Sequence, residues 1–369
     1  MKTGRTLQEI SQTILAQNAA KKDYVLDTGV LTMAPTEDKK DVNLSLTVKG
    51  EKRLYRPSSL CMEQIADRVR IPRKYAERMR AEAPELLATN VNHWFTNTPE
   101  KRMLRTLNNG QNVARAFLSD RYRPLDNHDL AQAVLPKLSV AGCEIRSIEI
   151  TESRFYIQAT TPKIQAIIEQ TVKVGTHNRI QRTVQAGVII GNSEVGLGSI
   201  FVEPIMFDLV CTNGLILQRT LRQHHVGRRA EGEILGDENT YELFSDDTRK
   251  LDDKAFWAKV CDVVDASMNE IKFNENIERL RKTQTQLLAE KNTEIEEVVE
   301  VTAKRFEFSD EEKGNLLLHF AQGGDFTKYG LINAVTRTAE DVTTYDRAVE
   351  LERLGGQIIE LPPSDFTKN

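Results

Sequence analysis

The chain has 369 residues, of which 40% are hydrophobic and 28% charged, and its formal net charge is -4. This composition excludes an intrinsically disordered chain, and the length predicts two domains. No run approaches the ~18 apolar residues of a membrane span, and the polar N-terminus lacks the apolar core of a signal peptide. We therefore expect a cytoplasmic protein that does not contact membranes.

The charges are unevenly distributed along the chain. Residues 1–230 contain 33 Lys and Arg against 23 Asp and Glu, whereas residues 231–369 contain 17 against 31. A basic body followed by an acidic region is typical of a protein that faces a polyanion, although a chance mixture of solvated surfaces would give the same totals. The four cysteines form no C-x-x-C pair, so they predict neither a zinc site nor a disulfide framework, and we expect no cofactor.

Residues 1–110 are predicted to form an N-terminal region with a strand and a helical hairpin. Alternating apolar residues between Val42 and Val48 indicate a half-buried strand. A helix capped by Ser58 or Ser59 follows, and Pro72 is expected to start a second helix whose Arg73, Lys74, Arg78 and Arg80 could contact phosphates. The pair resembles a helix-turn-helix, although Arg70 stands where that turn normally has glycine, and packing is the alternative role.

Residues 111–230 are predicted to form a basic α/β core. A strand and its exit loop begin near Asn112, and Asp126 or Asn127 caps the next helix. A hairpin then turns at residues 151–153, with Arg154, Tyr156 and Gln158 on the outer face of its second strand. Two apolar stretches flank GNSEVGLGS at 191–199, which is expected to be a turn between strands and not a phosphate-binding loop, because no Lys follows its glycines.

Residues 231–250 are polar and acidic and are predicted to be a linker or lid, and 251–369 a helical region. One helix is expected from Phe256 to Ile271, and one or two more across 287–299. Ser309 and Glu312 form a capping box, and the last helix is expected to run from about Leu331 to Leu354 and stop at Gly355-Gly356. The fold class is thus α+β, with a basic mixed antiparallel-sheet core, packed helices and an acidic helical C-terminal region.

The strongest candidate site is a basic and aromatic surface of the core. Arg and Lys neutralise phosphates, and aromatic rings stack on bases, so together they predict a groove for single-stranded nucleic acid. Exposed Arg and Tyr on a strand are otherwise a solvated face. The candidate residues are Arg115, Arg121, Tyr122, Arg123, Arg154, Tyr156, Lys173, Arg179, Arg182, Arg219, Arg222, His225, Arg228 and Arg229.

An enzyme is the alternative, most plausibly a metal-dependent nuclease or nucleotide-processing protein. Asp120, Asp126 and Asp129 could bind Mg²⁺ as nuclease carboxylates do, although their simpler role is loop and helix capping. The candidate residues of such an enzyme are Asp120, Asp126 and His225. The six histidines show no H-x-x-x-H or H-E-x-x-H spacing, so no metal ligand is predicted. A third class is an anti-defence module whose acidic helices bind a host protein.

Several segments resemble the phage/plasmid-like protein family known as domain of unknown function 932. They are residues 116–136, 191–216, 224–227 and 329–341, together with QIADRVRIPRKYAERM near residue 70. The resemblance implies a protein of a mobile element acting in DNA metabolism. A second resemblance, in architecture alone, is to the phage single-strand annealing proteins.

These observations lead us to expect a non-catalytic protein that binds single-stranded DNA in a basic groove and anneals complementary strands. Annealing needs only neutralised phosphates and accessible bases, so no covalent chemistry is required. Ring or filament homo-oligomers would align successive grooves. A host single-strand-binding protein is a further expected partner of the acidic region.

Overall fold

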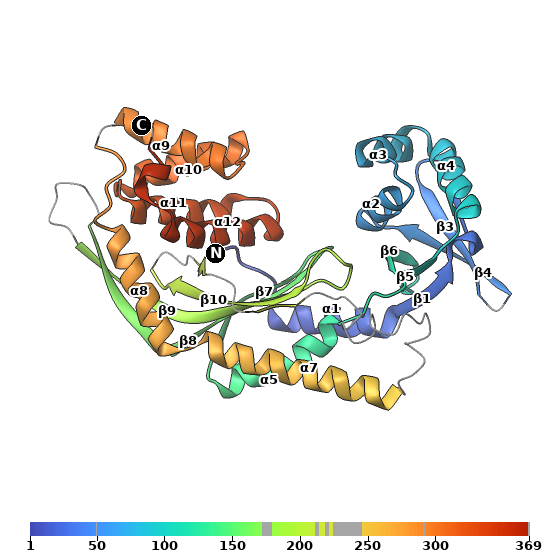
Figure 1. Ribbon diagram of the computed structural model, residues 1–369, viewed down its shortest axis with the longest axis horizontal. Helices are drawn as coiled ribbons and strands as arrows, with labels where there is room; N and C mark the ends of the chain where they lie inside the picture. Colours follow the sequence, from blue (N-terminus) through green and yellow to red (C-terminus); the bar gives the residue numbers. More distant parts are fainter. Residues whose placement is uncertain are drawn as a thin grey trace, which may run out of the picture.

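The computed structural model describes residues 1–48, 50–171, 179–210, 214–217, 221–223, 246–290 and 292–367. These residues form two six-stranded β-sheets and eleven α-helices, which confirms the predicted α+β class with a helical C-terminal region. None of the described helices is both long and apolar enough to cross a membrane. Figure 1 shows the two sheets side by side, each with its own helices.

The first sheet has the strand order β1-β5-β6-β4-β3-β2. Neighbouring strands are antiparallel except β4 and β6, which are parallel. The predicted strand at 42–48 is confirmed, and Val42, Leu44 and Leu46 are buried. The strands are β1 (Lys21–Asp27), β2 (Leu31–Pro35), β3 (Val42–Val48), β4 (Glu51–Pro57), β5 (Lys101–Leu107) and β6 (Val113–Ser119), with the short helix η1 (Thr28–Val30) between the first two.

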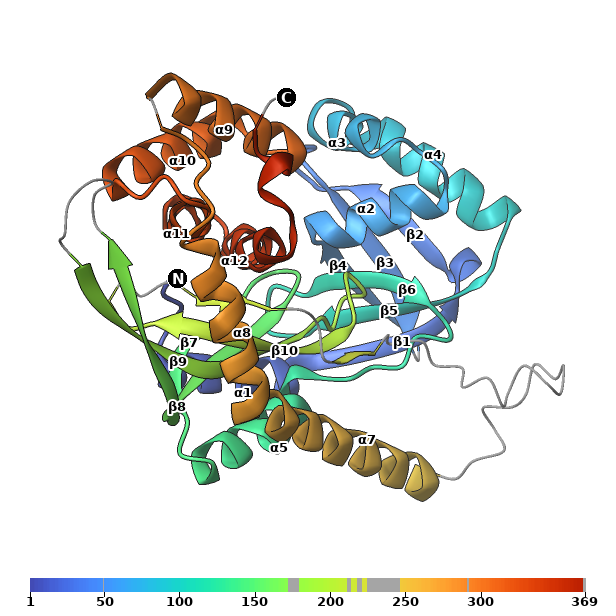
Figure 2. The same cartoon turned by 60° about the vertical axis from the view of Figure 1, so that its left-hand side comes forward.

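Three helices cover one face of this sheet, as Figure 2 shows. They are α2 (Ser59–Arg68), α3 (Arg73–Glu82) and α4 (Pro84–Asn97). The predicted helix pair is confirmed, and the Ser58 hydroxyl caps α2 by accepting from the Cys61 N–H. The sheet and these helices share one hydrophobic core and are called the first lobe.

The turn between α2 and α3 places Arg70 in the left-handed region, with φ 57°. The Ile71 N–H donates to the Ala66 carbonyl (2.9 Å) and the Arg70 N–H to the Asp67 carbonyl (3.2 Å), which is the Schellman pattern of helix termination. Ile71 then packs against the core of the first lobe. The turn thus has the geometry that glycine favours, although arginine occupies it.

We expect Arg70→Gly to stabilise the protein by about 0.5–1 kcal/mol, because relief of the left-handed strain exceeds the entropy that glycine gains in the unfolded chain. Arg70 is exposed, so little packing is lost. Urea unfolding measures the change, with Arg70→Ala as the control. Equal stabilisation by Ala and Gly would assign the effect to charge and not to the backbone.

The second sheet has the order β11-β10-β9-β8-β7, and β12 also pairs with β10. All of its pairings are antiparallel, and the predicted hairpin turning at 151–153 is confirmed. The strands are β7 (Glu144–Ile150), β8 (Phe155–Thr171), β9 (Arg179–Asn192), β10 (Ile200–Asp208), β11 (Gly214–Ile216) and β12 (Leu221–Gln223).

Helices cover both faces of the second sheet, and together they form the second lobe (Figure 1). One face packs against α1 (Leu7–Ala20), α5 (Asn127–Val140) and α7 (Asp246–Ser267). The other face is covered by the C-terminal helices, which are followed by the short helix η2 (Pro363–Asp365). These helices are α8 (Glu270–Thr283), α9 (Asn292–Arg305), α10 (Asp310–Gly323), α11 (Lys328–Asp341) and α12 (Tyr345–Glu360). Of them, α12 contacts β11 and α8 contacts β8, whereas α9 and α10 form an outer layer on α11.

Two predicted helices are each divided in the structure. The helix expected from Phe256 to Ile271 is α7 and α8, because Asn269 caps a new helix and leaves Ile271 exposed. The last predicted helix is α11 and α12, separated where Thr344 caps α12. Gly355-Gly356 was expected to stop that helix but lies inside α12, where it allows close packing.

The predicted boundaries between regions of the chain do not coincide with the two lobes. The limit at 110/111 falls between β5 and β6, which are neighbours in the first sheet, so 113–119 belong to the first lobe. Conversely, α1 packs with α5 and β7 of the second lobe. Of the predicted linker at 231–250, residues 246–250 begin α7 and the rest lie outside the described residues.

Candidate functional site

The structure describes the side chains of half of the predicted nucleic-acid-binding residues. Arg179 and Arg222 lie in β9 and β12, but their side chains are outside the described part of the chain. The others outside it are Lys173, Arg219, His225, Arg228 and Arg229. The described side chains are those of Arg115, Arg121, Tyr122, Arg123, Arg154, Tyr156 and Arg182.

Three of these side chains hold the loop between β9 and β10, here called the junction loop (residues 193–199). Arg115 pairs with Glu194 at 2.9 Å, and the Tyr122 hydroxyl donates to the Ser193 carbonyl at 3.0 Å. Arg154 donates to the Leu197 carbonyl at 2.6 Å. The predicted turn is confirmed, and these contacts, together with the packing of Val195 against Leu60 and Met103, make it the joint between the two lobes.

Arg105 forms the buried centre of this joint. Its side chain is 2% exposed and donates to Asp126 (2.7 Å), to Asp23 (3.1 Å) and to the Glu194 carbonyl (2.8 Å). Asp126 also pairs with Lys21. Burial acts to raise the pKa of Asp126, but Arg105 and Lys21 outweigh it and hold that pKa below its usual value. The residues of this network are far apart in sequence, and no local pattern identified Arg105.

Asp126 was predicted as a cap of α5 and does stand at the cap position. Its carboxylate binds Arg105 and Lys21, and it makes no side-chain capping hydrogen bond to the helix. The Glu194 carboxylate accepts from the Asn127 N–H at 2.6 Å instead. Because its carboxylate already neutralises Arg105, Asp126 is poorly placed as the ligand of a nuclease metal. Among the described residues, no group of three His, Cys, Asp or Glu side chains is arranged to hold a metal ion.

The remaining predicted residues also have partners within the fold. Tyr156 is 3% exposed, packs between Phe201 and Tyr345, and donates its hydroxyl to Asp346 at 2.7 Å. Stacking of Tyr156 on a base is not compatible with this burial. Arg123 pairs with Asp253 over the Phe256 ring, and Arg182 pairs with Asp208 at 2.9 Å, whereas Arg121 is exposed.

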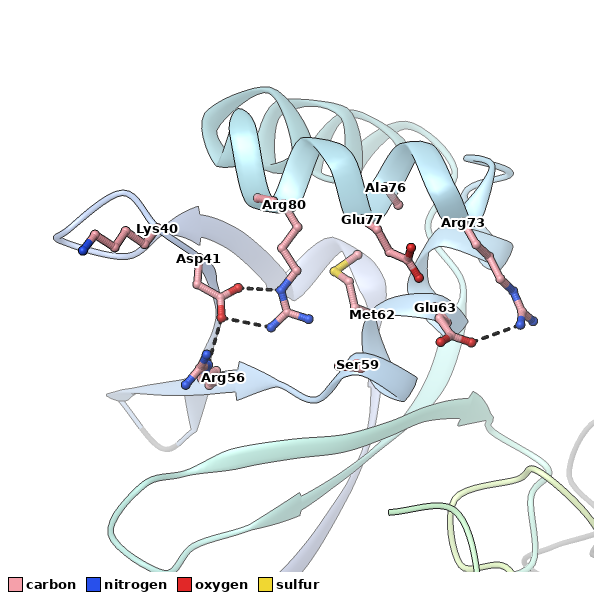
Figure 3. A pocket seen from close by; sticks show the side chains of 11 residues that line it. Lys40, Asp41, Arg56, Ser59, Met62, Glu63, Arg73, Ala76, Glu77 and Arg80 are labelled. Atoms are coloured by element: carbon pink, nitrogen blue, oxygen red, sulfur yellow. Dashed lines mark hydrogen bonds and ion pairs between the residues drawn. The ribbon is translucent and has the colours of Figure 1, made fainter. Parts of the chain in front are cut away.

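A cavity lined by several cations lies in the first lobe, between β4 and α3 (Figure 3). We call it the β4–α3 hollow; its volume is about 390 Å³. The apolar side chains Met62 and Ala76 form part of its wall. Its charged residues come from the segment before β3 and from β4, α2 and α3: Lys40, Arg56, Arg73 and Arg80 with Asp41, Glu63 and Glu77.

Asp41 organises the cations on one side of this hollow. Arg80 binds it through two nitrogens (2.5 and 3.0 Å), and Arg56 binds it at 2.8 Å. Burial acts to raise the pKa of Asp41, but the arginines hold it below its usual value, so the carboxylate is charged. The Arg56 side chain remains 68% exposed. It can therefore reach a ligand in solvent without leaving a buried position.

The opposite side of the hollow is formed by α2 and α3. Arg73 pairs with Glu63 at 3.0 Å and with Asp67 at 2.5 Å, as Figure 3 shows for the first of these contacts. The Arg73 side chain is 53% exposed. Exposed ion pairs of this kind contribute little to stability and exchange readily with other charges. Arg73 is thus available for a competing anion at small cost.

Comparison with family models, curated proteins and solved structures found no match to this chain. The resemblance to the phage/plasmid-like family and to the annealing proteins therefore remains a prediction. Any assignment of function rests on the chain's own side chains and their geometry.

Proposed function

We propose that this protein binds single-stranded DNA through the phosphate backbone, with the β4–α3 hollow as a principal contact surface. The observation that supports this most is that Arg56 and Arg80 meet at Asp41 on one side of the hollow and Arg73 lines the other side. Lys40 lies at the rim, with its side chain pointing outward (Figure 3). Phosphate contacts of this kind dominate nucleic-acid affinity and do not depend on sequence. The net positive charge of residues 1–230 also favours binding of a polyanion.

In this proposal the hollow takes the place of four residues of the predicted groove. Arg115, Arg123 and Arg182 neutralise carboxylates within the fold, and Tyr156 has no open ring face, so these residues support the structure and not the strand. The cations of the hollow also pair with carboxylates, but Arg56 and Arg73 do so at exposed positions. A phosphate can take Arg73 from Glu63 and Asp67, which are partly exposed. It can also take Arg56 from Asp41 without creating a buried unpaired charge, because Asp41 keeps its ion pair with Arg80.

Annealing and assembly form the second part of the proposal. A strand held by its phosphates presents its bases to solvent, so a complementary strand can pair with it. A single hollow contacts few nucleotides, and repetition of it in a ring or filament would raise the affinity of the assembly. In keeping with the resemblance to a mobile-element family, we propose that this activity serves phage or plasmid DNA metabolism.

The double variant Arg56→Gln, Arg73→Gln is expected to bind a labelled single-stranded oligonucleotide about tenfold more weakly, with a salt dependence smaller by about one to two phosphate contacts. In contrast, Asp41→Asn is expected to raise affinity, because Arg56 and Arg80 then lack their shared counterion. Fluorescence anisotropy across a salt series measures both effects.

Arg279→Gln is the control for loss of charge alone, because Arg279 is an exposed cation of α8 that pairs with Glu360. It should bind DNA as the unaltered protein does. Absence of DNA binding at low salt would refute the proposed function. Equal affinity in the double variant and the control would remove the hollow from the contact surface.

A further inference from the structure

A second hollow, of about 130 Å³, lies in the second lobe between the junction loop, β10 and α12. Arg154 comes from the end of the hairpin turn, and Arg353 comes from α12. Burial raises the pKa of the Tyr156 hydroxyl, whereas both guanidinium groups act to lower it. Both arginines line the same hollow, so two cations from distant parts of the chain lie here.

Three carboxylates line this hollow, and each already has a partner; Glu350 pairs with Arg347 at 3.0 Å. Glu203 is fully buried and pairs with Arg353, whose guanidinium lies over the Phe201 ring. Asp346 accepts from the hydroxyls of Tyr156 (2.7 Å) and Ser153 (2.6 Å). Arg353 is thus both neutralised and fixed in orientation by its neighbours.

Arg154 is the cation that lacks a counterion in this hollow. It is half-buried and, within the described part of the chain, it donates to the Leu197 carbonyl and forms no ion pair with a carboxylate. A Cβ atom on Gly198 would lie 2.5 Å from an Arg154 terminal nitrogen, so a side chain at residue 198 would displace the guanidinium from its present position. The loop fixes Arg154 but leaves its charge unneutralised.

We propose that this hollow binds a phosphate group, with Arg154 as the main ligand and Arg353 as the second cation. A half-buried guanidinium favours an oxyanion because its planar N–H groups match the oxygens of phosphate. The phosphate could belong to a DNA strand or to a free phosphate compound. The inference goes beyond the proposed function, because the site would bind phosphate in either case.

Titration of the full chain with inorganic phosphate tests the site by calorimetry, in the Arg56→Gln, Arg73→Gln background so that the β4–α3 hollow contributes little. Arg154→Gln is expected to weaken phosphate binding about tenfold. Gly198→Ala keeps the charge but displaces the guanidinium, so it should weaken binding as well. Arg279→Gln should leave it unchanged, and thermal unfolding confirms that each variant is folded.

DNA binding by Arg154→Gln in the otherwise unaltered chain then distinguishes the two sources of phosphate. A lower DNA affinity and a smaller salt dependence would assign the site to the strand, whereas unchanged DNA affinity with lost phosphate binding would assign it to a free phosphate compound. No phosphate binding at millimolar concentration, or equal binding after Arg154→Gln, would overturn the inference. Failure of DNA binding alone would refute only the proposed function.

Discussion

Replacement of Gly356 by alanine is expected to destabilise the protein by about 3 kcal/mol, because the new methyl group would have no space. A Cβ atom at this position would lie 1.8 Å from the Ile216 carbonyl oxygen. That oxygen belongs to the backbone of β11, which is buried against α12. The helix must therefore move away from the sheet and lose part of its packing.

Two other glycines provide a graded comparison. A Cβ on Gly355 would meet the side chains of Thr336 (2.6 Å) and Leu215 (2.8 Å), which can shift, so Gly355→Ala should cost less than Gly356→Ala. A Cβ on Gly314, in α10, would meet nothing within 4 Å. Gly314→Ala should stabilise the protein by about 0.5–1 kcal/mol through helix propensity alone.

Denaturant unfolding followed by circular dichroism measures all three variants. The expected order of stability is Gly314→Ala, unaltered protein, Gly355→Ala and Gly356→Ala. If Gly356→Ala does not yield folded protein, Gly355→Ala still reports on the same interface. Stability of Gly356→Ala equal to that of the unaltered protein would show that α12 does not pack against β11 as described.

These glycines also show where prediction from the sequence stops. A glycine pair after an apolar periodic segment is the usual sign of a helix end, and the same two letters allow a helix to approach a sheet. Which of these two roles the glycine pair has depends on the position of β11, which lies more than a hundred residues earlier in the chain. In contrast, a feature formed by residues close together in the sequence was predicted correctly: the structure has the capping box of Ser309 and Glu312.

The candidate site has the same limitation. The alternating pattern of 154–158 correctly places Tyr156 and Gln158 of β8 on one face, together with Arg154 just before the strand. It does not show that α12 covers Tyr156 and Gln158. The sequence of a polar strand face predicts exposure to solvent, because it does not show whether a distant element supplies polar partners. Here α12 supplies them, since Asp346 binds Tyr156 and Glu352 binds Gln158. Of the cations of the β4–α3 hollow, only Arg73 and Arg80 of α3 were predicted as phosphate contacts. Lys40 and Arg56 were not.

Glu352 is the buried carboxyl group of the α12 interface. Its side chain accepts from the Gln158 amide at 3.0 Å, and its second oxygen has no hydrogen-bond partner in the described part of the chain. The residue is 1% exposed. Burial raises the pKa of this carboxyl from 4.5 to about 7, against the smaller opposing effects of the N-terminal ammonium group and the Gln158 amide.

The raised pKa predicts the pH dependence of stability. Between pH 4.5 and about 7 the folded protein keeps a proton on Glu352 that the unfolded chain releases. The free energy of unfolding should therefore fall as pH rises through this window, by about 3 kcal/mol at most from this group. Below pH 4.5 both states are protonated, and this contribution no longer changes.

Glu352→Gln is therefore expected to stabilise the protein above pH 7 by up to about 3 kcal/mol and to remove the fall in stability between pH 4.5 and 7. Glutamine has the shape of the protonated acid and can keep a hydrogen bond to Gln158. Glu350→Gln is the control, because Glu350 lies on the same helix with its side chain 57% exposed and should leave the pH profile unchanged. Urea unfolding at a series of pH values separates the two. An unchanged profile after Glu352→Gln would mean that the carboxyl is not buried between α12 and β8, and it would place the helix differently over the sheet.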